Sequence, residues 1–414
     1  MPLRFLTAGE SHGPALTAIL EGMPAGVKLS AAHLNQHLRR RQLGYGRGRR
    51  MQIESDEVEI LSGVRHGRTL GGPVALMIRN NDWPRWQRAM AVEAPEDPEE
   101  IQAAAEKDWR LRPVTRPRPG HADWPGALKY NFTDARNVLE RASARETAMR
   151  VAVGAAAAAL LGEFGIRIGS HVVRLGPVAA PSDKDAPPPA PETLDRADQS
   201  PVRCLDPEAS AAMVAAVDEA KAKGETLGGV FEVVAWGVPP GLGSHVQWDR
   251  KLDARLAAAV MSIQAVKAVE FGIGFEAGAR FGSQAHDPIL VDGEAARRRV
   301  YRPTNRAGGI EGGMSNGQPI VLRAAMKPLA TLYDPLPSID METLEPAEGA
   351  IERSDVTAVP AAAVVAEAAV AFELARAMIE KFGGDSLAEM RRSYDAYVSE
   401  LARRGVVFEP AADA

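Results

Sequence analysis

Apolar runs alternate with amphipathic stretches along this chain, and the alternation predicts strands that are followed by helices. The apolar stretches at residues 17–26 and 229–241 each predict a strand that ends in a turn rich in glycine and proline. Apolar positions at helical spacing then predict one helix over about 31–41, with Ser30 as its cap, and another over about 247–263. Two distant segments therefore predict the same strand–turn–helix unit.

Two further pairs of segments follow in the same order. The first pair consists of two predicted strands, which begin at Gly72 and at Gln318. The second pair consists of two long Ala/Val helices, which end at Phe164 and at Phe382. We infer duplicated α/β halves, over about 1–175 and 228–385, within a single domain that spans 1–414. Ala-rich helices that end near glycine are common, so these helices alone do not establish the repeat.

The segment between the two halves has a different composition. Residues 177–207 are rich in Pro, Ala and Asp and show little periodicity. This pattern predicts a mobile surface excursion that lies outside the core. A helix predicted over about 210–221 would pack back onto the body of the protein.

Composition and charge narrow the class of protein. The 414 residues are 45% apolar and 25% charged, which is typical of a globular protein with a large core. The net charge of −5 argues against a general nucleic-acid binder. The single cysteine, Cys204, excludes an internal disulfide and fits a reducing cytoplasm. The longest apolar stretch, residues 151–161, is too short to span a bilayer, so we expect no membrane association.

The first candidate for chemistry follows an apolar run at residues 3–6. Gly9 and Gly13 flank Glu10, Ser11 and His12. The glycines allow a sharp turn that exposes the side chains, and the histidine can carry a proton near neutral pH. The same residues match the nucleophile elbow of serine hydrolases, with Ser11 as nucleophile, but that elbow needs a sheet already built upstream. A plain polar turn is the third interpretation.

An arginine-rich stretch forms the second candidate. Six arginines and three glycines lie between Arg39 and Arg50. Arginine binds phosphate and carboxylate groups through two parallel hydrogen bonds, and glycines let several arginines converge on one anion. The alternative is an RNA-binding segment, which the acidic net charge disfavours. We therefore expect a site for a small anion.

Four later motifs complete the candidate site. His121 directly follows a rigid loop of arginines and prolines and is a candidate acid for a leaving anion. Residues 143–146 read as a capping box, and the glycine-dense loop 308–317 is able to present N–H groups to a phosphate. Arg353 and Asp355 precede another helix. No His, Cys or carboxylate cluster has the spacing of metal ligands, so no metal site is expected.

Together these motifs resemble the chorismate synthase family, over Met1 to about Phe382. The matching blocks are 9–13, 116–123, 140–147, 251–255, the loop at 308–317, Lys327-Pro328 and 353–355. The resemblance implies an α+β fold, a β-α-β sandwich with internal pseudo-symmetry, and a homotetramer. It also implies a cytoplasmic lyase of the shikimate pathway and aromatic amino-acid biosynthesis.

The resemblance implies a reaction that the residues alone do not reveal. In it, 5-enolpyruvylshikimate 3-phosphate loses phosphate and a ring hydrogen in a 1,4-elimination to give chorismate. The family requires reduced FMN (FMNH2), without net redox change, and is associated with NADP. No segment here looks like an added flavin reductase, so an external reductase is expected to supply the reduced flavin.

The resemblance also assigns roles to individual residues. His12 would protonate the reduced flavin, His121 would assist the departing phosphate, and Asp355 would relay a proton with Ser11 and Ser143. Substrate would be bound by Arg41, Arg47 and Arg50. FMN would be lined by Arg141, Ala142, Ser143, Gln264, Ala265, Gly312, Lys327, Pro328, Leu329, Ala330, Thr331 and Arg353. Gln264 departs from the Pro or Asn that other members often carry at this position.

Overall fold

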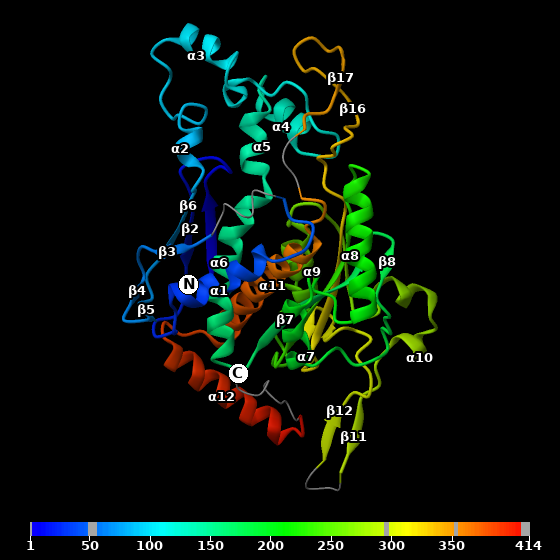
Figure 1. Ribbon diagram of the computed structural model, residues 1–414. Helices are drawn as coiled ribbons and strands as arrows, with labels where there is room; N and C mark the ends of the chain where they lie inside the picture. The colour runs from blue at the N-terminus through cyan, green and yellow to red at the C-terminus, as the bar shows by residue number, and fades with distance from the viewer. Residues whose placement is uncertain (1, 49–55, 294–297, 352–354, 407–414) are drawn as a thin grey trace.

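The computed structural model describes residues 2–48, 56–293, 298–351 and 355–406, and these residues form an α+β fold (Figure 1). Two antiparallel sheets flank a pair of long helices. Helix α6 contacts the first sheet, helix α11 contacts the second sheet, and the two helices contact each other. The helices are α6 (Thr147–Gly162) and α11 (Val359–Phe382).

The first sheet has four strands in the order β1-β2-β6-β3. Their bounds are β1 (Arg4–Ala8), β2 (Ala15–Glu21), β6 (Val74–Arg79) and β3 (Val58–Ile60). Alternate residues such as Leu16, Ala18 and Leu20 are buried, whereas Leu6 is 78% exposed. This period of two is that of a sheet with one covered face. The strands predicted at 3–6, 17–26 and 72 are confirmed.

The second sheet has five strands in the order β10-β15-β9-β7-β8. Their bounds are β10 (Val266–Phe271), β15 (Ile320–Met326), β9 (Gly229–Trp236), β7 (Arg167–Leu175) and β8 (Val178–Ala179). Strand β9 is buried continuously from Phe231 to Trp236, because both faces are covered. The strands predicted at 229–241 and 318 are thus confirmed.

The helices follow the sequence pattern with one correction. Helix α1 (Ala31–Gln42) has Ser30 as its N-cap, as predicted, and the Ser30 hydroxyl accepts from the His33 N–H. The helix predicted over 247–263 is shorter. A 3₁₀ turn at Trp248–Arg250 precedes α9 (Leu252–Met261), since the Leu252 N–H is bonded to the carbonyl of Gly313.

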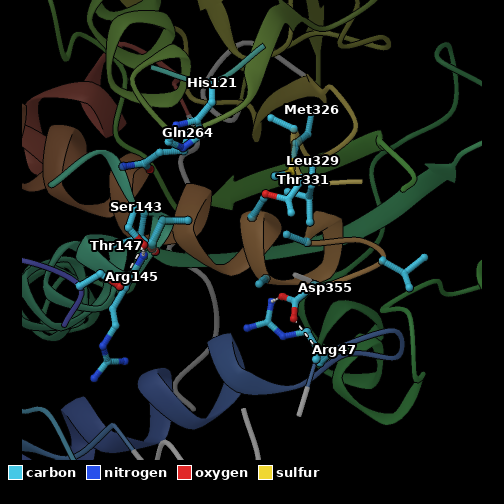
Figure 2. A pocket seen from close by; sticks show the side chains of 18 of the residues that line it. Arg47, His121, Ser143, Arg145, Thr147, Gln264, Met326, Leu329, Thr331 and Asp355 are labelled. Atoms are coloured by element: carbon cyan, nitrogen blue, oxygen red, sulfur yellow. Dashed lines mark hydrogen bonds and ion pairs between the residues drawn. The ribbon is translucent and has the colours of Figure 1, made fainter. Parts of the chain in front are cut away.

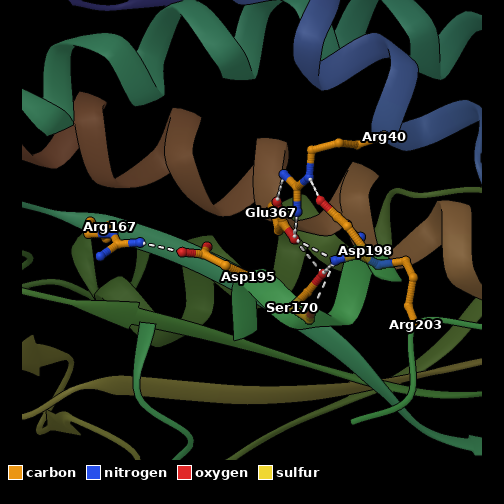
Figure 3. Close-up of polar contacts among 7 residues, drawn as sticks. All are labelled: Arg40, Arg167, Ser170, Asp195, Asp198, Arg203 and Glu367. Atoms are coloured by element: carbon orange, nitrogen blue, oxygen red, sulfur yellow. Dashed lines mark hydrogen bonds and ion pairs between the residues drawn. The ribbon is translucent and has the colours of Figure 1, made fainter. Parts of the chain in front are cut away.

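The segment 177–207 does not behave as a surface excursion throughout. Its second part folds into α7 (Pro191–Asp195) and a 3₁₀ turn (Arg196–Gln199), and it buries Leu194, Val202 and the entire Arg203 side chain. Figure 3 shows why a charged residue is tolerated there. The Arg203 guanidinium faces Glu367 of α11 at 3.2 Å and the Ser170 carbonyl at 2.9 Å, with Asp198 beside it. The expectation failed because Glu367 and Ser170 come from other segments of the chain.

The remaining elements surround this frame. The helices are α2 (Trp83–Trp86), α3 (Pro98–Ala105), α4 (Asp123–Tyr130), α5 (Arg136–Ala142), α8 (Pro207–Ala222), α10 (Gly282–Ala285) and α12 (Leu387–Arg403). Two-stranded hairpins are β4–β5 (Val64–Arg65, Arg68–Thr69), β11–β12 (Leu290–Asp292, Arg299–Tyr301), β13–β14 (Ile310–Glu311, Met314–Ser315) and β16–β17 (Pro337–Ile339, Pro346–Glu348). In the described part of the chain, every helix is too short or insufficiently apolar to cross a membrane.

Candidate active site

A cavity of about 690 Å³ collects many of the predicted site residues (Figure 2). Segments that are far apart in the sequence line it: the β1–β2 turn, the end of α1, the loop before α4, the start of α6, and the approach to α11. The predicted residues on its wall are Ser11, His12, Arg41, Arg47, His121, Ser143, Gln264, Leu329, Ala330, Thr331 and Asp355. Its volume is that of a site for small organic ligands.

His12 lies in the β1–β2 turn and is held by a buried carboxylate. The His12 Nδ1 lies 2.8 Å from Glu140 Oε1, and the His12 backbone N–H donates to Glu140 Oε2 at 2.8 Å. Trp86 stacks on the imidazole, with the ring centroids 3.9 Å apart. Because Nδ1 faces the carboxylate, Nε2 is the ring atom left for exchange with a ligand.

His121 has a comparable arrangement on another segment. Its Nδ1 lies 2.6 Å from Asp123 Oδ1, and Arg118 Nε donates to Asp123 Oδ2 at 2.8 Å. Burial of Asp123 opposes its ionisation, but the hydrogen bonds from His121 and Arg118 outweigh that effect and lower the pKa of the carboxyl group. The ionised Asp123 accepts a hydrogen bond from His121 Nδ1 and so holds the imidazole in place at the cavity wall.

The arginine loop, residues 43–48, closes one side of the cavity. Arg47 Nη1 lies 3.1 Å from Asp355 Oδ2, and the Gly48 N–H donates to Asp355 Oδ1 at 2.6 Å. Figure 2 shows Arg47 and Asp355 side by side, apart from Ser143. The Tyr45 N–H donates to the Pro201 carbonyl at 2.7 Å, so the loop rests on the segment that was expected to lie outside the core.

Arg41 lines the cavity but is already engaged with the protein. Its side chain donates to Thr147 Oγ1 at 3.0 Å, to Asp56 Oδ2 at 3.2 Å and to the Ala144 carbonyl at 3.1 Å. Arg145 donates to the other Asp56 oxygen at 2.7 Å. This geometry favours a role for Arg41 in fixing the wall. Arg50 and Arg353 lie outside the described residues.

The segment before α6 differs from the capping box that we expected. The Ser143 hydroxyl accepts from the Arg145 N–H at 3.3 Å and lies 3.3 Å from Ser11 Oγ. Glu146 does not return to Ser143; it accepts from Gln264 Nε2 and pairs with Arg150, each at 2.8 Å. A 3₁₀ turn (Ala144–Glu146) consequently precedes the α-helix.

Six predicted cofactor residues do not line the cavity: Arg141, Ala142, Ala265, Gly312, Lys327 and Pro328. Arg141 is exposed and donates to the carbonyls of Thr7 and Gly9. Lys327 lies close by, since its Nζ donates to the Gly120 carbonyl at 2.9 Å beside His121. Burial and the neighbouring Lys267 lower the pKa of Lys327. Gly312 forms the turn of the β13–β14 hairpin.

Sequence reasoning missed several residues of the site. Glu140 and Trp86 contact His12, Asp123 holds His121, and Arg118, Arg145 and Lys221 line the cavity. Asp123 was discoverable, because it stands two residues after His121 in the sequence. No local signal marks Trp86 or Glu140 as a partner of His12, which lies 128 residues before Glu140.

The comparisons with known proteins agree in one family. The family model described as chorismate synthase matches residues 3–379. Chorismate synthase from Thermobifida fusca (strain YX) is 58% identical over 97% of this chain and 100% of its own length. The enzyme from Pelobacter propionicus is 59% identical over 96% of this chain and 99% of its own length.

A solved structure agrees with these sequence relatives. A chorismate synthase crystal structure is 46% identical, covers 97% of this chain and 98% of its own, and superposes with a TM-score of 0.75. The serine hydrolase and RNA-binding alternatives gain no support from these relatives. The chain belongs to the chorismate synthase family of carbon–oxygen lyases, which act on a small molecule in aromatic amino-acid biosynthesis.

Proposed function

We propose that the cavity binds 5-enolpyruvylshikimate 3-phosphate together with reduced FMN, and that 1,4-elimination of phosphate there yields chorismate. One observation carries this proposal. Two histidines, each bonded to a buried carboxylate, line the same cavity as an arginine-bearing loop. This is an arrangement for moving protons beside a bound anion.

The residues of the cavity fit a flavin. Leu139, Ile263 and Met326 give it an apolar wall suited to a ring system. Gln264 Oε1 is buried on that wall and has no hydrogen-bond partner among the described residues, so it is available to a donor on a ligand. We propose that Gln264, Ser143 and the segment 329–331 hold FMN. When bound, reduced FMN supplies an electron-rich ring to a reaction that has no net redox change.

We propose that Arg47 binds the anionic groups of the substrate. Arg41 and Arg50, which lie near it in the sequence, are proposed to contribute to the same anion site. Arg118 adds a further cation on the side of His121. His121 would give a proton to the departing phosphate from Nε2, because Nδ1 faces Asp123. The phosphate would then leave next to positive charge, which stabilises the anion.

His12 would serve the flavin side of the cavity as proton donor through Nε2. Asp355 is proposed to relay a proton with Ser11 and Ser143. The contact of 3.3 Å between the two serine hydroxyls supports their joint role. The contacts of Asp355 with Arg47 and Gly48 hold the carboxylate in place at the cavity wall.

We also propose that the fold is a single domain, a pseudo-symmetric β-α-β sandwich made of duplicated halves. The strand orders support this. Reading β1, β2, β6 and β3 as the counterparts of β7, β9, β15 and β10 gives the same order of neighbours in both sheets. Helices α6 and α11 then correspond, and each packs on the sheet of its own half, with the boundary between the halves falling before β7 and not at residue 175.

Assembly, location and electron supply are further proposals. A homotetramer is supported by exposed aromatic residues, since Phe275 is 82% and Phe281 79% exposed in the single chain. Gly312, in the turn of the β13–β14 hairpin, stays a proposed contact of FMN. The buried lone thiol of Cys204 fits the cytoplasm. An external reductase would supply the reduced flavin.

An anaerobic assay tests the proposed function. Pre-reduced FMN should support many turnovers per flavin, with one phosphate released per chorismate, and oxidised FMN alone should support none. Stoichiometric oxidation of the flavin with each product molecule would show an ordinary redox reaction instead. Titration with oxidised FMN, with and without substrate, would separate binding of the cofactor from turnover.

A further inference from the structure

The imidazole of His12 is contacted both at its edge and on its face. Glu140 from α5 lies at the Nδ1 edge, at 2.8 Å and 3.0 Å from its two carboxylate oxygens. Trp86 from α2 lies against the ring face, with 25° between the two planes. Both partners are buried, at 2% and 4% exposure. The established family reaction does not by itself explain why so much buried structure surrounds one side chain.

The edge contact selects a tautomer. A carboxylate only accepts hydrogen bonds, so Nδ1 beside Glu140 must carry the proton. Arg136 Nη1 lies 3.6 Å from Glu140 Oε1, so the carboxylate is held between the arginine and the imidazole. In the neutral ring, Nε2 is then the lone-pair atom, and it is also the atom that gains and loses the transferable proton.

The face contact fixes the orientation of the ring. The Arg136 guanidinium also lies over the Trp86 ring, 5.3 Å from its centroid. The Trp86 Nε1–H donates to Asp82 Oδ2 at 3.1 Å, so the indole is itself held in place. A stacked indole restricts rotation of the imidazole about its side-chain bonds.

The backbone of the turn is fixed as well. Asn80 donates from Nδ2 to the carbonyls of Ser11 and Gly13, at 3.2 Å and 2.9 Å. The Ser11 N–H donates to the carbonyl of Glu140 at 3.0 Å. Main chain, ring edge and ring face are therefore each held by a separate buried group.

We propose that Glu140 and Trp86 are positioning residues that hold His12 as the Nδ1–H tautomer with Nε2 presented to the bound ligand. This proposal rests on the proposed function for its kinetic consequence, but its structural consequence is independent of it. Neither residue needs to touch substrate or cofactor.

The test combines kinetics with a direct observation of the ring. Protein labelled with [15N]histidine and free of cofactor should show a proton on Nδ1 of His12, assigned by comparison with His12→Gln. Glu140→Gln should remove that preference, because the Gln amide group is able to donate to Nδ1. The Glu140→Gln variant should have a kcat that is lower by about 10- to 150-fold, which corresponds to the loss of one charge-assisted hydrogen bond. Its KM for the substrate should stay within about twofold of the wild-type value.

Trp86 provides a second, independent variant. Trp86→Leu removes the stacked ring and should lower kcat by about two- to tenfold, whereas Trp86→Phe retains an aromatic face and should recover most of the loss. Matched controls are Glu57→Gln, an exposed carboxylate, and Trp248→Phe, a residue that is 75% exposed. Both controls should behave as wild type.

Clear outcomes would overturn the proposal. They are an unchanged Nδ1 proton in Glu140→Gln, or a rise in KM without a loss of kcat, or equal activity of Trp86→Leu and wild type. If Glu140→Gln does not fold, Glu140→Asp and the Trp86 pair carry the test. If wild-type protein fails to release phosphate from the substrate, the proposed function fails, while the histidine spectrum still decides the tautomer.

Discussion

Replacing Asp123 by Asn should separate the charge of this side chain from its shape. Asp123 is completely buried and accepts from the Arg118 N–H at 3.1 Å, from Arg118 Nε at 2.8 Å, from Arg118 Nη2 at 3.1 Å and from His121 Nδ1 at 2.6 Å. Asn has one acceptor oxygen, so its NH₂ group would face either Arg118 or His121, and both of these are donors.

Two magnitudes follow from these contacts. Breaking a buried ion pair costs about 3–5 kcal/mol, and the 10% exposure of the Arg118 side chain places the loss near the lower end, about 3 kcal/mol. A charge-assisted hydrogen bond to His121 is worth about 1.5–3 kcal/mol. If His121 is charged when phosphate departs, kcat should fall by about 10- to 150-fold.

The effect on stability has a defined pH dependence. The pKa of Asp123 is lower in the folded protein than in the unfolded chain, because the bonds from His121 and Arg118 outweigh burial. Its contribution is therefore complete above the ordinary Asp pKa of about 3.9 and is lost as the pH falls through the folded pKa. The difference in melting temperature between wild type and Asp123→Asn should persist from about pH 5 to 8 and shrink below about pH 4.

Phosphate release and thermal unfolding measure these two effects. The matched control is Asp108→Asn, which breaks a similar pair with Arg110, at 2.8 Å, on the surface. That pair is worth at most about 1 kcal/mol because water screens it. If Asp123→Asn were as active and as stable as Asp108→Asn, a role for the Asp123 charge in holding His121 would be refuted.

Three shorter predictions follow. His121→Ala should lower kcat by about 100-fold or more. Its melting temperature should change little, because Arg118 still pairs with Asp123. A fully active variant would contradict the role of His121 as proton donor. Arg47→Lys should raise the substrate KM by about tenfold and leave FMN binding unchanged, since Lys lacks the planar fork; the reverse pattern would assign the loop to the flavin. Burial and the Arg40 cation lower the pKa of His37 to about 4 in the folded protein. As the pH falls, His37 therefore becomes protonated in the unfolded chain at a higher pH than in the folded protein. Urea unfolding should therefore show a loss of up to about 3 kcal/mol between pH 6.5 and 4, which His37→Gln abolishes.

The sequence predicts those parts of the fold that depend on local pattern. Period-two burial in β2 and the cap at Ser30 follow from neighbouring residues, and the structure confirms both. His12 and His121 were recognisable because glycine and arginine motifs surround them. These features need no knowledge of which segments meet in space.

The sequence does not predict contacts between distant segments. Arg203 lies in a proline-rich stretch that reads as surface, yet Glu367, 164 residues later, neutralises it in the interior. Glu140 reads as an ordinary helical carboxylate until the fold brings it to His12. In both cases a charge becomes understandable only when its buried partner is known, because burial without that partner would cost several kcal/mol.

The two central helices explain how an acidic protein builds a site for anions. Helix α6 begins at Thr147 and α11 at Val359, and residues at both beginnings line the cavity. The N-terminal ends of helices carry partial positive charge, so two such ends reinforce the arginine loop. The two helices also pack closely against each other. A Cβ added at Gly154 of α6 would lie 2.4 Å from the Cβ of Ala368 in α11, which shows that the backbones touch. This close packing sets the spacing between the part of the cavity that holds Ser143 and the part that holds Asp355. The cavity can thus present positive charge locally, although the net charge of the whole chain is −5.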